Sequence, residues 1–192
     1  MKPVKIFCLP GGTLPQRQTE GAIGFDVRAR AIVSATDMDL QNPNLRRTIF
    51  DFKAVPEDER VRGQVFDLPG SHNGRELVYR MQPGESVLVG IGFVTEMTFP
   101  MFYWVAPRSG LASKYNIQVT NAPGTVDPDY RGEAGVLVLN RGPNHFDLRC
   151  NMRIAQIIFS TALIPEFDEV SLFNNLGESH RNTGGFGSTG LK

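Results

Sequence analysis

Five short stretches of the sequence carry the residue types that could do chemistry. Residues 106–112 read APRSGLA and follow an apolar run that is typical of a strand. Arg108, Ser109 and Gly110 could present a guanidinium, a hydroxyl and backbone N–H groups to one anion. The alternative is a surface turn that happens to contain an arginine.

A second stretch, residues 121–133, reads NAPGTVDPDYRGE, and its prolines and glycines predict a tight hairpin. Main-chain N–H and C=O groups at the tip of such a hairpin can imitate a pairing partner and read the edge of a base. Asp127 and Asp129 flank a proline, so an extended backbone would place them on opposite sides, one of them facing a site. Both could also be ordinary turn aspartates. Arg131 and Glu133 are interpreted as part of a solvated face.

Three further polar residues lie in strand-like surroundings. Asp26 stands between apolar residues in 24–29, GFDVRA, and is either a solvent-facing or turn-bonding carboxylate or a partner of metal-bound water. Gln156 interrupts the apolar run 153–159, RIAQIIF, and a buried amide needs partners, which are either structural or a ligand. Tyr130 could offer its flat face to a sugar, although packing in a core is the commoner fate of a strand tyrosine.

The last stretch, residues 181–190, reads RNTGGFGSTG. Its glycines could wrap phosphates by backbone N–H donation, and its phenylalanine could stack on a base, a contact worth about 1–3 kcal/mol. It lacks the Gly-Lys-Ser/Thr of a Walker A loop. On composition alone, residues 174–192 are interpreted as a mobile terminus.

The elements that must position these residues are predicted to be short strands. Period-two runs of β-branched and aromatic residues, bounded by proline, glycine or asparagine, are typical of strands. Such runs occupy residues 86–97, 101–105, 135–139 and 152–160. Only residues 111–115 favour a helical turn, so the chain is predicted to be all-β.

Residues from about 36 to 76 do not share this rhythm. Polar, turn-rich segments alternate there with two runs that could form strands, 47–55 and 63–68. A structureless loop of this length would be unusual in a compact domain, so we interpret the segment as an inserted β-hairpin or small lobe.

Composition bounds the class of protein. A chain of 192 residues fits one domain, and its 20 Lys plus Arg balance 20 Asp plus Glu, which predicts no direct binding to nucleic acid or membrane. Cys8 and Cys150 are too few for a disulfide scaffold and are interpreted as buried thiols. No signal-peptide core or long apolar run is visible, so a soluble, cytoplasmic protein is expected.

Taken in order, the five stretches closely resemble the five ordered motifs of the trimeric dUTPase family, the deoxyuridine 5′-triphosphate nucleotidohydrolases. The lead-in 14–27, LPQRQTEGAIGFDV, and the turn 82–92, QPGESVLVGIG, also resemble that family. The resemblance covers residues 3–35 and 77–192 and omits the inserted segment.

This resemblance implies a fold and an activity. The fold is a jelly-roll-like β-barrel, the dUTPase-like β-clip, formed by one domain over residues 1–192. The family assembles as a homotrimer with sites between subunits, and the C-terminal arm, about 174–192, closes a neighbour's site. The implied reaction is hydrolysis of dUTP to dUMP and pyrophosphate by water attack on the α-phosphorus. This dUTP diphosphatase activity limits uracil incorporation into DNA and supplies dUMP for thymidylate synthesis.

The resemblance also implies roles for single residues. Asp127 matches the catalytic carboxylate that orients and deprotonates the attacking water. Asp26, acting through metal-bound water, and Gln156 match residues that hold the magnesium–triphosphate. Mg²⁺ keeps several waters and prefers phosphate oxygens, so a dedicated cluster of protein ligands is not required.

The remaining matched positions would bind substrate. Tyr130 matches the aromatic residue packed against deoxyribose, which leaves no room for a 2′-hydroxyl. The hairpin that reads uracil matches Asn121, Gly124, Thr125 and Val126. The motif that binds phosphate matches Arg108, Ser109 and Gly110. The arm that stacks on the base and contacts phosphate matches Arg181, Phe186, Gly187, Ser188 and Thr189.

Two features depart from the family pattern. Asn182 stands where the family usually has glycine, although asparagine tolerates positive φ better than most residues. The separation from Asp26 to Arg108 is 108 − 26 = 82 residues because of the inserted segment. That segment could alter trimer contacts or bind an additional macromolecular partner.

Two other functions fit the sequence less well than dUTP hydrolysis. Deamination of dCTP, a reaction of the same superfamily, needs a glutamate where this chain has Leu137. A protein that only senses dUTP or binds a partner would be expected to have damaged catalytic motifs, yet Asp127, Asp26, Arg108 and Arg181 are all present.

Overall fold

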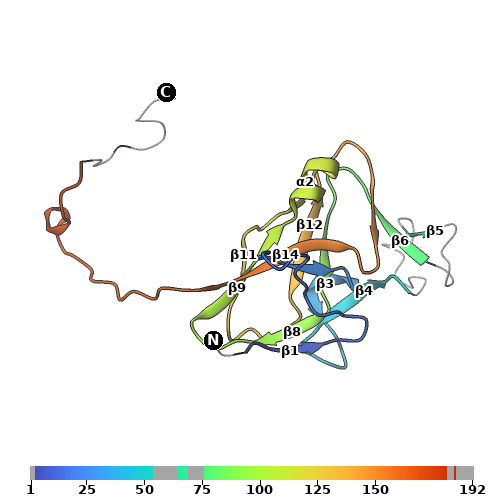
Figure 1. Ribbon diagram of the computed structural model, residues 1–192, viewed down its shortest axis with the longest axis horizontal. Helices are drawn as coiled ribbons and strands as arrows, with labels where there is room; N and C mark the ends of the chain where they lie inside the picture. Colours follow the sequence, from blue (N-terminus) through green and yellow to red (C-terminus); the bar gives the residue numbers. More distant parts are fainter. Residues whose placement is uncertain (1–2, 54–64, 69–75, 181–183, 185–192) are drawn as a thin grey trace. The chain divides into compact units, whose positions relative to one another are not determined.

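The computed structural model describes residues 3–53, 65–68, 76–180 and 184 (Figure 1). The chain divides into two units, residues 1–162 and 163–192. All the described strands lie in the first unit, while the second contains a short 3₁₀-helix, η1 (Phe173–Asn175). No helix in the described ranges is long and apolar enough to cross a membrane.

The strands of the first unit are short and are connected mostly by turns. In chain order they are β1 (Lys5–Cys8), β2 (Phe25–Arg28), β3 (Ala31–Met38), β4 (Arg46–Asp51), β5 (Val65–Leu68), β6 (Glu76–Met81), β7 (Ser86–Gly90), β8 (Phe93–Glu96), β9 (Met101–Pro107), β10 (Ile117–Val119), β11 (Gly124–Val126), β12 (Gly135–Asn140), β13 (Phe146–Arg149) and β14 (Arg153–Thr161).

These strands pair in four antiparallel sheets. The two larger sheets have the orders β10-β12-β7-β3-β4 and β11-β9-β14-β2. The smaller sheets are β1-β8 and β13-β6-β5. The predicted all-β class is therefore confirmed for the described part of the chain.

Three of the predicted strand runs each correspond to one strand, β9, β12 or β14, although Met152 of the third run precedes β14. The run 86–97 instead divides into β7 and β8, because Gly92 has φ +78° and breaks the extended backbone. The expected helical turn is the helix α2 (Ser109–Tyr115), which begins two residues earlier than predicted. Asn116 ends α2 in the left-handed conformation, with φ 55°.

The inserted segment contributes to two different sheets. β4 pairs with β3 at the edge of the five-stranded sheet, and β5 pairs with β6 in the three-stranded sheet. The register between β3 and β4 shifts between Val33 and Met38, so residues 34–37 form a bulge. In this bulge the Ser34 hydroxyl accepts a hydrogen bond from the Asp37 backbone N–H at 2.9 Å.

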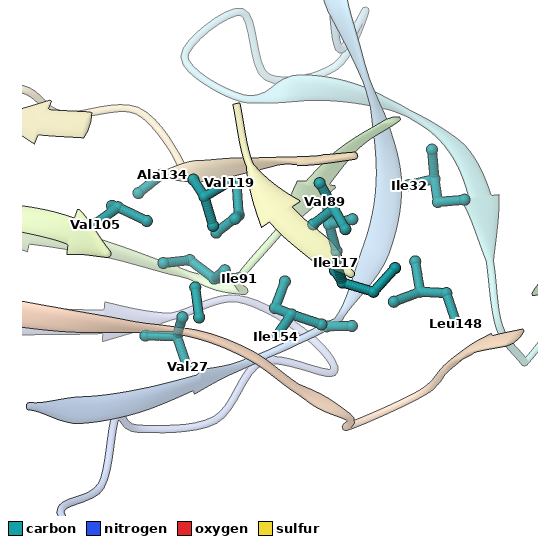
Figure 2. Packing of buried hydrophobic residues seen from close by; sticks show 14 of the residues in the cluster. Val27, Ile32, Val89, Ile91, Val105, Ile117, Val119, Ala134, Leu148 and Ile154 are labelled. Atoms are coloured by element: carbon teal, nitrogen blue, oxygen red, sulfur yellow. The ribbon is translucent and has the colours of Figure 1, made fainter. Parts of the chain in front are cut away.

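The core lies among the sheets, and Figure 2 shows some of its aliphatic side chains. Its largest fully buried side chains are aromatic, namely Tyr103, Phe50, Phe52 and Phe93. Removing this apolar surface from water is the main favourable term in folding. Both larger sheets contribute fully buried side chains, among them Val27, Ile32, Val89, Val105, Ile117, Val138 and Ile154.

Two predictions about burial were wrong. Cys8 and Cys150 form no disulfide, and both are partly exposed rather than buried. Cys8 is the last residue of β1 and Cys150 follows β13, and both pack against the edge of the core as partly buried side chains. Glu133, interpreted as solvated, is buried with 1% of its surface exposed, whereas Arg131 beside it is exposed as expected.

Glu133 is buried because three donors satisfy its carboxylate. The Arg30 guanidinium donates to both oxygens, at 2.8 Å and 2.6 Å, and the Gly92 backbone N–H donates at 2.8 Å. A side chain at Gly90 would have no room, because its Cβ would lie 2.5 Å from the Glu133 carboxylate. Buried ion pairs persist only when such additional hydrogen bonds offset the cost of desolvation.

We expect Glu133→Gln to lower the free energy of unfolding by about 3–5 kcal/mol, because Arg30 then keeps a buried charge without its carboxylate. Urea denaturation followed by circular dichroism measures the change. Glu96→Gln is the control, since Glu96 forms an exposed pair with Lys5 and its loss should have little effect. Equal losses in the two variants would contradict a special role for the buried pair.

Candidate active site

Residues 121–133, predicted to form a tight hairpin, lie between β10 and β12, and their strand β11 pairs with β9 instead of with either neighbour in sequence. The described residues therefore show no pairing of two strands within this segment, for which we keep the name hairpin. β10 ends at Val119, and β11 pairs with β9 so that Gly124 lies opposite Val105. The Asn121 amide packs against the hairpin where Gly124 has no side chain, since a Cβ there would lie 2.9 Å from its nitrogen. A side chain at position 124 would therefore require the Asn121 amide to move.

A pocket of about 200 Å³ opens beside this hairpin. It gathers the predicted catalytic residue and the predicted base- and sugar-binding residues, namely Asn121, Gly124, Thr125, Val126, Asp127 and Tyr130. Val105, Ala134 and Gly135 complete its wall together with Arg46, which comes from the inserted segment. We call this space the hairpin pocket. Sequence reasoning missed Arg46 because no motif contains it.

The Tyr130 ring has a fixed position beside the pocket. Its hydroxyl donates to the backbone carbonyl of Glu133 at 3.1 Å, and its backbone N–H donates to the Asp127 carbonyl at 3.3 Å. The ring folds over Gly132, where a Cβ would lie 2.4 Å from the hydroxyl oxygen. Tyr130 therefore presents a partly exposed ring rather than packing in the core.

The ionisable groups around the hairpin differ in their exposure. Tyr103 lies opposite Val126 in the β9–β11 pairing, and burial raises the pKa of its phenol to about 12. Tyr103 is therefore neutral at physiological pH. Asp127 is exposed and is the only acidic residue among the described residues that line the hairpin pocket.

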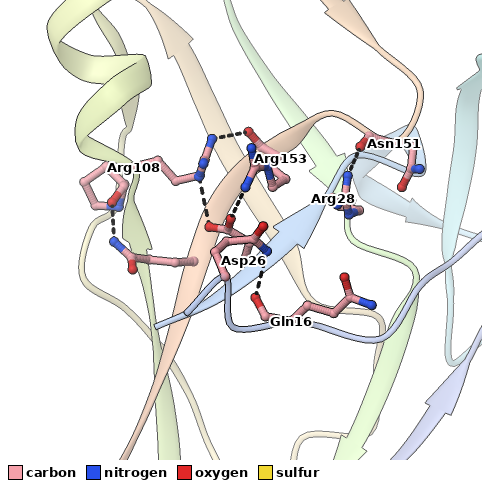
Figure 3. Close-up of polar contacts among 9 residues, drawn as sticks. Gln16, Asp26, Arg28, Arg108, Asn151 and Arg153 are labelled. Atoms are coloured by element: carbon pink, nitrogen blue, oxygen red, sulfur yellow. Dashed lines mark hydrogen bonds and ion pairs between the residues drawn. The ribbon is translucent and has the colours of Figure 1, made fainter. Parts of the chain in front are cut away.

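A second cluster of polar residues surrounds Asp26 (Figure 3). One carboxylate oxygen accepts a hydrogen bond from Arg108 Nε at 2.9 Å, and the other accepts one from Arg153 at 3.1 Å. Arg108 also donates to the Arg153 backbone carbonyl at 3.2 Å. The Asp26 side chain is only 11% exposed, so it is an ion-paired residue and not the solvent-facing carboxylate considered above.

Arg153 is a residue of this cluster that sequence reasoning did not identify. The pairing of β14 with β2 places Gln156 opposite Asp26 and Arg153 opposite Arg28. This register depends on a bulge between Arg153 and Ala155. The bulge has no local signal in the sequence, so the contact of Arg153 with Asp26 could not be derived from it.

A separate pocket of about 360 Å³ lies beside the Asp26 cluster and is called the arginine pocket here. It gathers the predicted phosphate- and metal-site residues Asp26, Arg108, Ser109, Gly110 and Gln156, together with Gln18, Ala22, Ile23 and Gly24. Gln156 is partly exposed rather than buried, and its amide donates to the Pro107 carbonyl at 3.0 Å. A side chain at Gly24 would overlap this amide, so Gln156 would have to move.

The predicted site residues therefore divide into two groups in one chain. The hairpin pocket and the arginine pocket share no lining residue. The predicted arm residues Arg181, Phe186, Gly187, Ser188 and Thr189 lie outside the described residues. In the described ranges, no three His, Cys, Asp or Glu side chains form a cluster that could hold a metal ion by themselves.

Comparison with known proteins shows which family the chain is similar to. The protein-family model dUTPase matches residues 77–190. The deoxyuridine 5′-triphosphate nucleotidohydrolase of Heliobacterium modesticaldum is 35% identical over 186 residues, which cover 95% of this chain and 92% of that protein. The corresponding protein of Gloeothece citriformis is 46% identical over 109 residues, covering 57% of this chain and 73% of its own length.

Solved structures show the same fold at lower identity. The Staphylococcus bacteriophage 80alpha dUTPase with dUPNHPP has a TM-score of 0.68 at 15% identity, and the match covers all of both chains. The dUTPase from phage phi11 of S. aureus has a TM-score of 0.60 at 12% identity, with 91% of this chain and all of that chain covered.

The antiparallel sheets make the chain an all-β protein, and its fold is that of these solved structures. The chain belongs to the dUTPase family, as the five motifs indicated. The match to the Heliobacterium protein leaves only 5% of this chain uncovered, so it includes most of residues 36–76. The family model, in contrast, begins directly after that segment.

We expect Asp26→Asn to reduce the free energy of unfolding by about 2 kcal/mol, because two guanidinium groups then face each other without the charge that both contact. Urea denaturation measures this change. Gln18→Ala is the control, since Gln18 lines the same pocket and, among the described residues, its side chain donates only to the Gln16 carbonyl, at 3.3 Å. Wild-type stability of Asp26→Asn would show that the ion pairs contribute nothing net.

Proposed function

We propose that this protein is a dUTP diphosphatase that hydrolyses dUTP to dUMP and pyrophosphate, using Asp127 as the general base. Membership of the dUTPase family supports the activity. The observation that carries the proposal is the hairpin pocket, where Asp127 lies with the hairpin residues and Tyr130.

The pocket suits selection of a deoxyuridine nucleotide. The backbone of Gly124, Thr125 and Val126 at the hairpin would pair with the edge of uracil, together with the Asn121 amide. The Tyr130 ring would pack against deoxyribose and exclude a 2′-hydroxyl. Asp127 would orient a water and remove its proton during in-line attack on the α-phosphorus, with pyrophosphate as the leaving group.

The arginine pocket would hold the triphosphate and its Mg²⁺. Arg108, Ser109 and Gly110 offer a guanidinium, a hydroxyl and backbone donors to phosphate oxygens. Asp26 is the only carboxylate among the described residues of this pocket, which fits an ion held mainly by phosphates and water. Asp26 and Gln156 would orient that hydrated ion, whose positive charge would stabilise the negative charge that develops on the leaving pyrophosphate.

A homotrimer would join the two pockets. Because the pockets share no lining residue in one chain, a site between subunits could combine the hairpin pocket of one copy with the arginine pocket of another. In the second unit Leu163 and Phe167 are each 95% exposed, which supports a partner surface that covers them. We further propose a closed, jelly-roll-like barrel and a C-terminal arm that supplies Arg181 and Phe186 to a neighbouring site.

We expect Asp127→Asn to lower kcat for dUTP by at least about 100-fold while dUTP still binds, because a positioned base contributes roughly 10²–10⁴ to the rate. Pyrophosphate release from dUTP, dCTP, dTTP and UTP, with Mg²⁺ or with EDTA, measures activity and selectivity together. Asp129→Asn is the matched control across Pro128, since Asp129 does not line the hairpin pocket. Normal turnover by Asp127→Asn would remove Asp127 from this role.

We expect Gly132→Ala to reduce the preference for dUTP over UTP by roughly tenfold, because its methyl group would displace the Tyr130 ring. The ratio of kcat/KM for the two substrates measures the effect. Gly21→Ala is the control, because an added Cβ there meets nothing within 4 Å. An unchanged ratio in Gly132→Ala would mean that the Tyr130 ring does not select the sugar.

A further inference from the structure

The inserted segment places one side chain in the hairpin pocket. Arg46, the first residue of β4, lines this pocket together with Asn121, Asp127 and Tyr130. Among the described residues that line it, Arg46 is the only cation and Asp127 is the only anion. Arg46 lies outside all five motifs and outside the residues that match the family model.

The bulge in β3 holds the Arg46 guanidinium in place. One terminal nitrogen, Nη1, donates to the Ala35 carbonyl at 2.6 Å and approaches the Ser34 carbonyl at 3.5 Å. The bulge itself is closed by Ser34, whose hydroxyl accepts the backbone N–H groups of Thr36 and Asp37. These bonds use Nη1, whereas a guanidinium has five N–H donors on three nitrogens.

The neighbouring arginine behaves differently. Arg47 forms an ion pair with Asp37 at 2.6 Å, and both side chains are at least one-third exposed. Arg46 forms no ion pair with any of the described residues, and its bonds go to neutral carbonyls. Its charge is therefore not neutralised by a carboxylate in the described part of the chain, and it is the arginine of this pair that the pocket contains.

We propose that Arg46 is a phosphate-binding residue of the nucleotide site and contacts the 5′-phosphate next to Asp127. This inference rests on the proposed function, since the role of Asp127 places the α-phosphate of the substrate near its carboxylate. The Asp127 carboxylate and a phosphate beside it repel each other, and a guanidinium in the same pocket offsets this repulsion. Its planar group of donors also matches phosphate oxygens in pairs. The inserted segment thus supplies part of the substrate site.

Nucleotide binding by the full-length chain tests this role. Arg46→Gln removes the charge but keeps a side chain that can donate to the bulge, Arg46→Lys keeps the charge, and Arg47→Gln is the matched control. The probes are deoxyuridine, which has no phosphate, and dUMP. Trp104, the only tryptophan, lies opposite Thr125 of the hairpin, so its fluorescence can report binding, with calorimetry as a second readout.

Arg46→Gln should weaken binding of dUMP by roughly 10- to 100-fold, the usual effect of losing a charge-assisted hydrogen bond, and leave binding of deoxyuridine within about twofold. Arg46→Lys should recover part of the loss, and Arg47→Gln should bind both ligands like the wild type. Equal losses for deoxyuridine and dUMP would overturn the assignment to phosphate. Wild-type binding of dUMP by Arg46→Gln would overturn the proposal altogether.

Failure of this inference can be distinguished from failure of the proposed function. Pyrophosphate release by the wild-type chain tests the function without any change at Arg46. If the wild type hydrolyses dUTP and Arg46→Gln still binds dUMP normally, only the role of Arg46 is rejected. If the wild type does not hydrolyse dUTP but loses dUMP affinity on Arg46→Gln, the phosphate contact stands and the activity does not. Thermal unfolding of each variant confirms that the folded protein is being compared.

Discussion

The buried carboxylate of Glu133 connects the parts of the chain on which the hairpin pocket depends. It accepts hydrogen bonds from Arg30, which follows β2, and from the Gly92 backbone, which separates β7 from β8. The backbone carbonyl of the same residue accepts the Tyr130 hydroxyl. One residue thus fixes the base of the hairpin to the sheets and fixes the aromatic ring at its side. A burial that would be costly for an unpaired carboxylate becomes a source of rigidity because every acceptor has a charged or backbone donor.

The parts of this structure that sequence reasoning could predict are those determined locally. Period-two patterning predicted β9, β12 and β14, and proline and glycine marked the turns on either side of Asp127. The burial of Glu133 could not be predicted, because its arginine partner is 103 residues away in the chain. The contact between Arg153 and Asp26 spans 127 residues and depends on a β-bulge. Motif order therefore indicated which residues matter, while sheet register decided which of them meet.

Both pockets contain an aspartate and an arginine, but only in the arginine pocket are the two in direct contact. In the arginine pocket, Asp26 and Arg108 are in direct contact at 2.9 Å, so much of the charge on each is already compensated. In the hairpin pocket, Arg46 bonds to backbone carbonyls, and Asp127 is exposed. A compensated carboxylate is suited to orienting its neighbours, whereas an exposed one can accept a proton. The zero net charge of the chain is therefore consistent with an anionic substrate, because local placement decides the field at each pocket.

The inserted segment shows how a large addition can be compatible with an existing site. β4 and β5 add to the edges of two sheets, so the pairings among β2, β9, β11 and β14 are independent of them. Additions at sheet edges also cost little, since loop closure depends only weakly on length. The edge position has a second consequence, because a bulge in the edge hairpin can redirect a side chain. The bulge at Ser34 holds the Arg46 guanidinium, and Arg46 lines a pocket whose other walls lie in a different part of the sequence. An insertion that leaves every motif intact can in this way still change the electrostatics of the site.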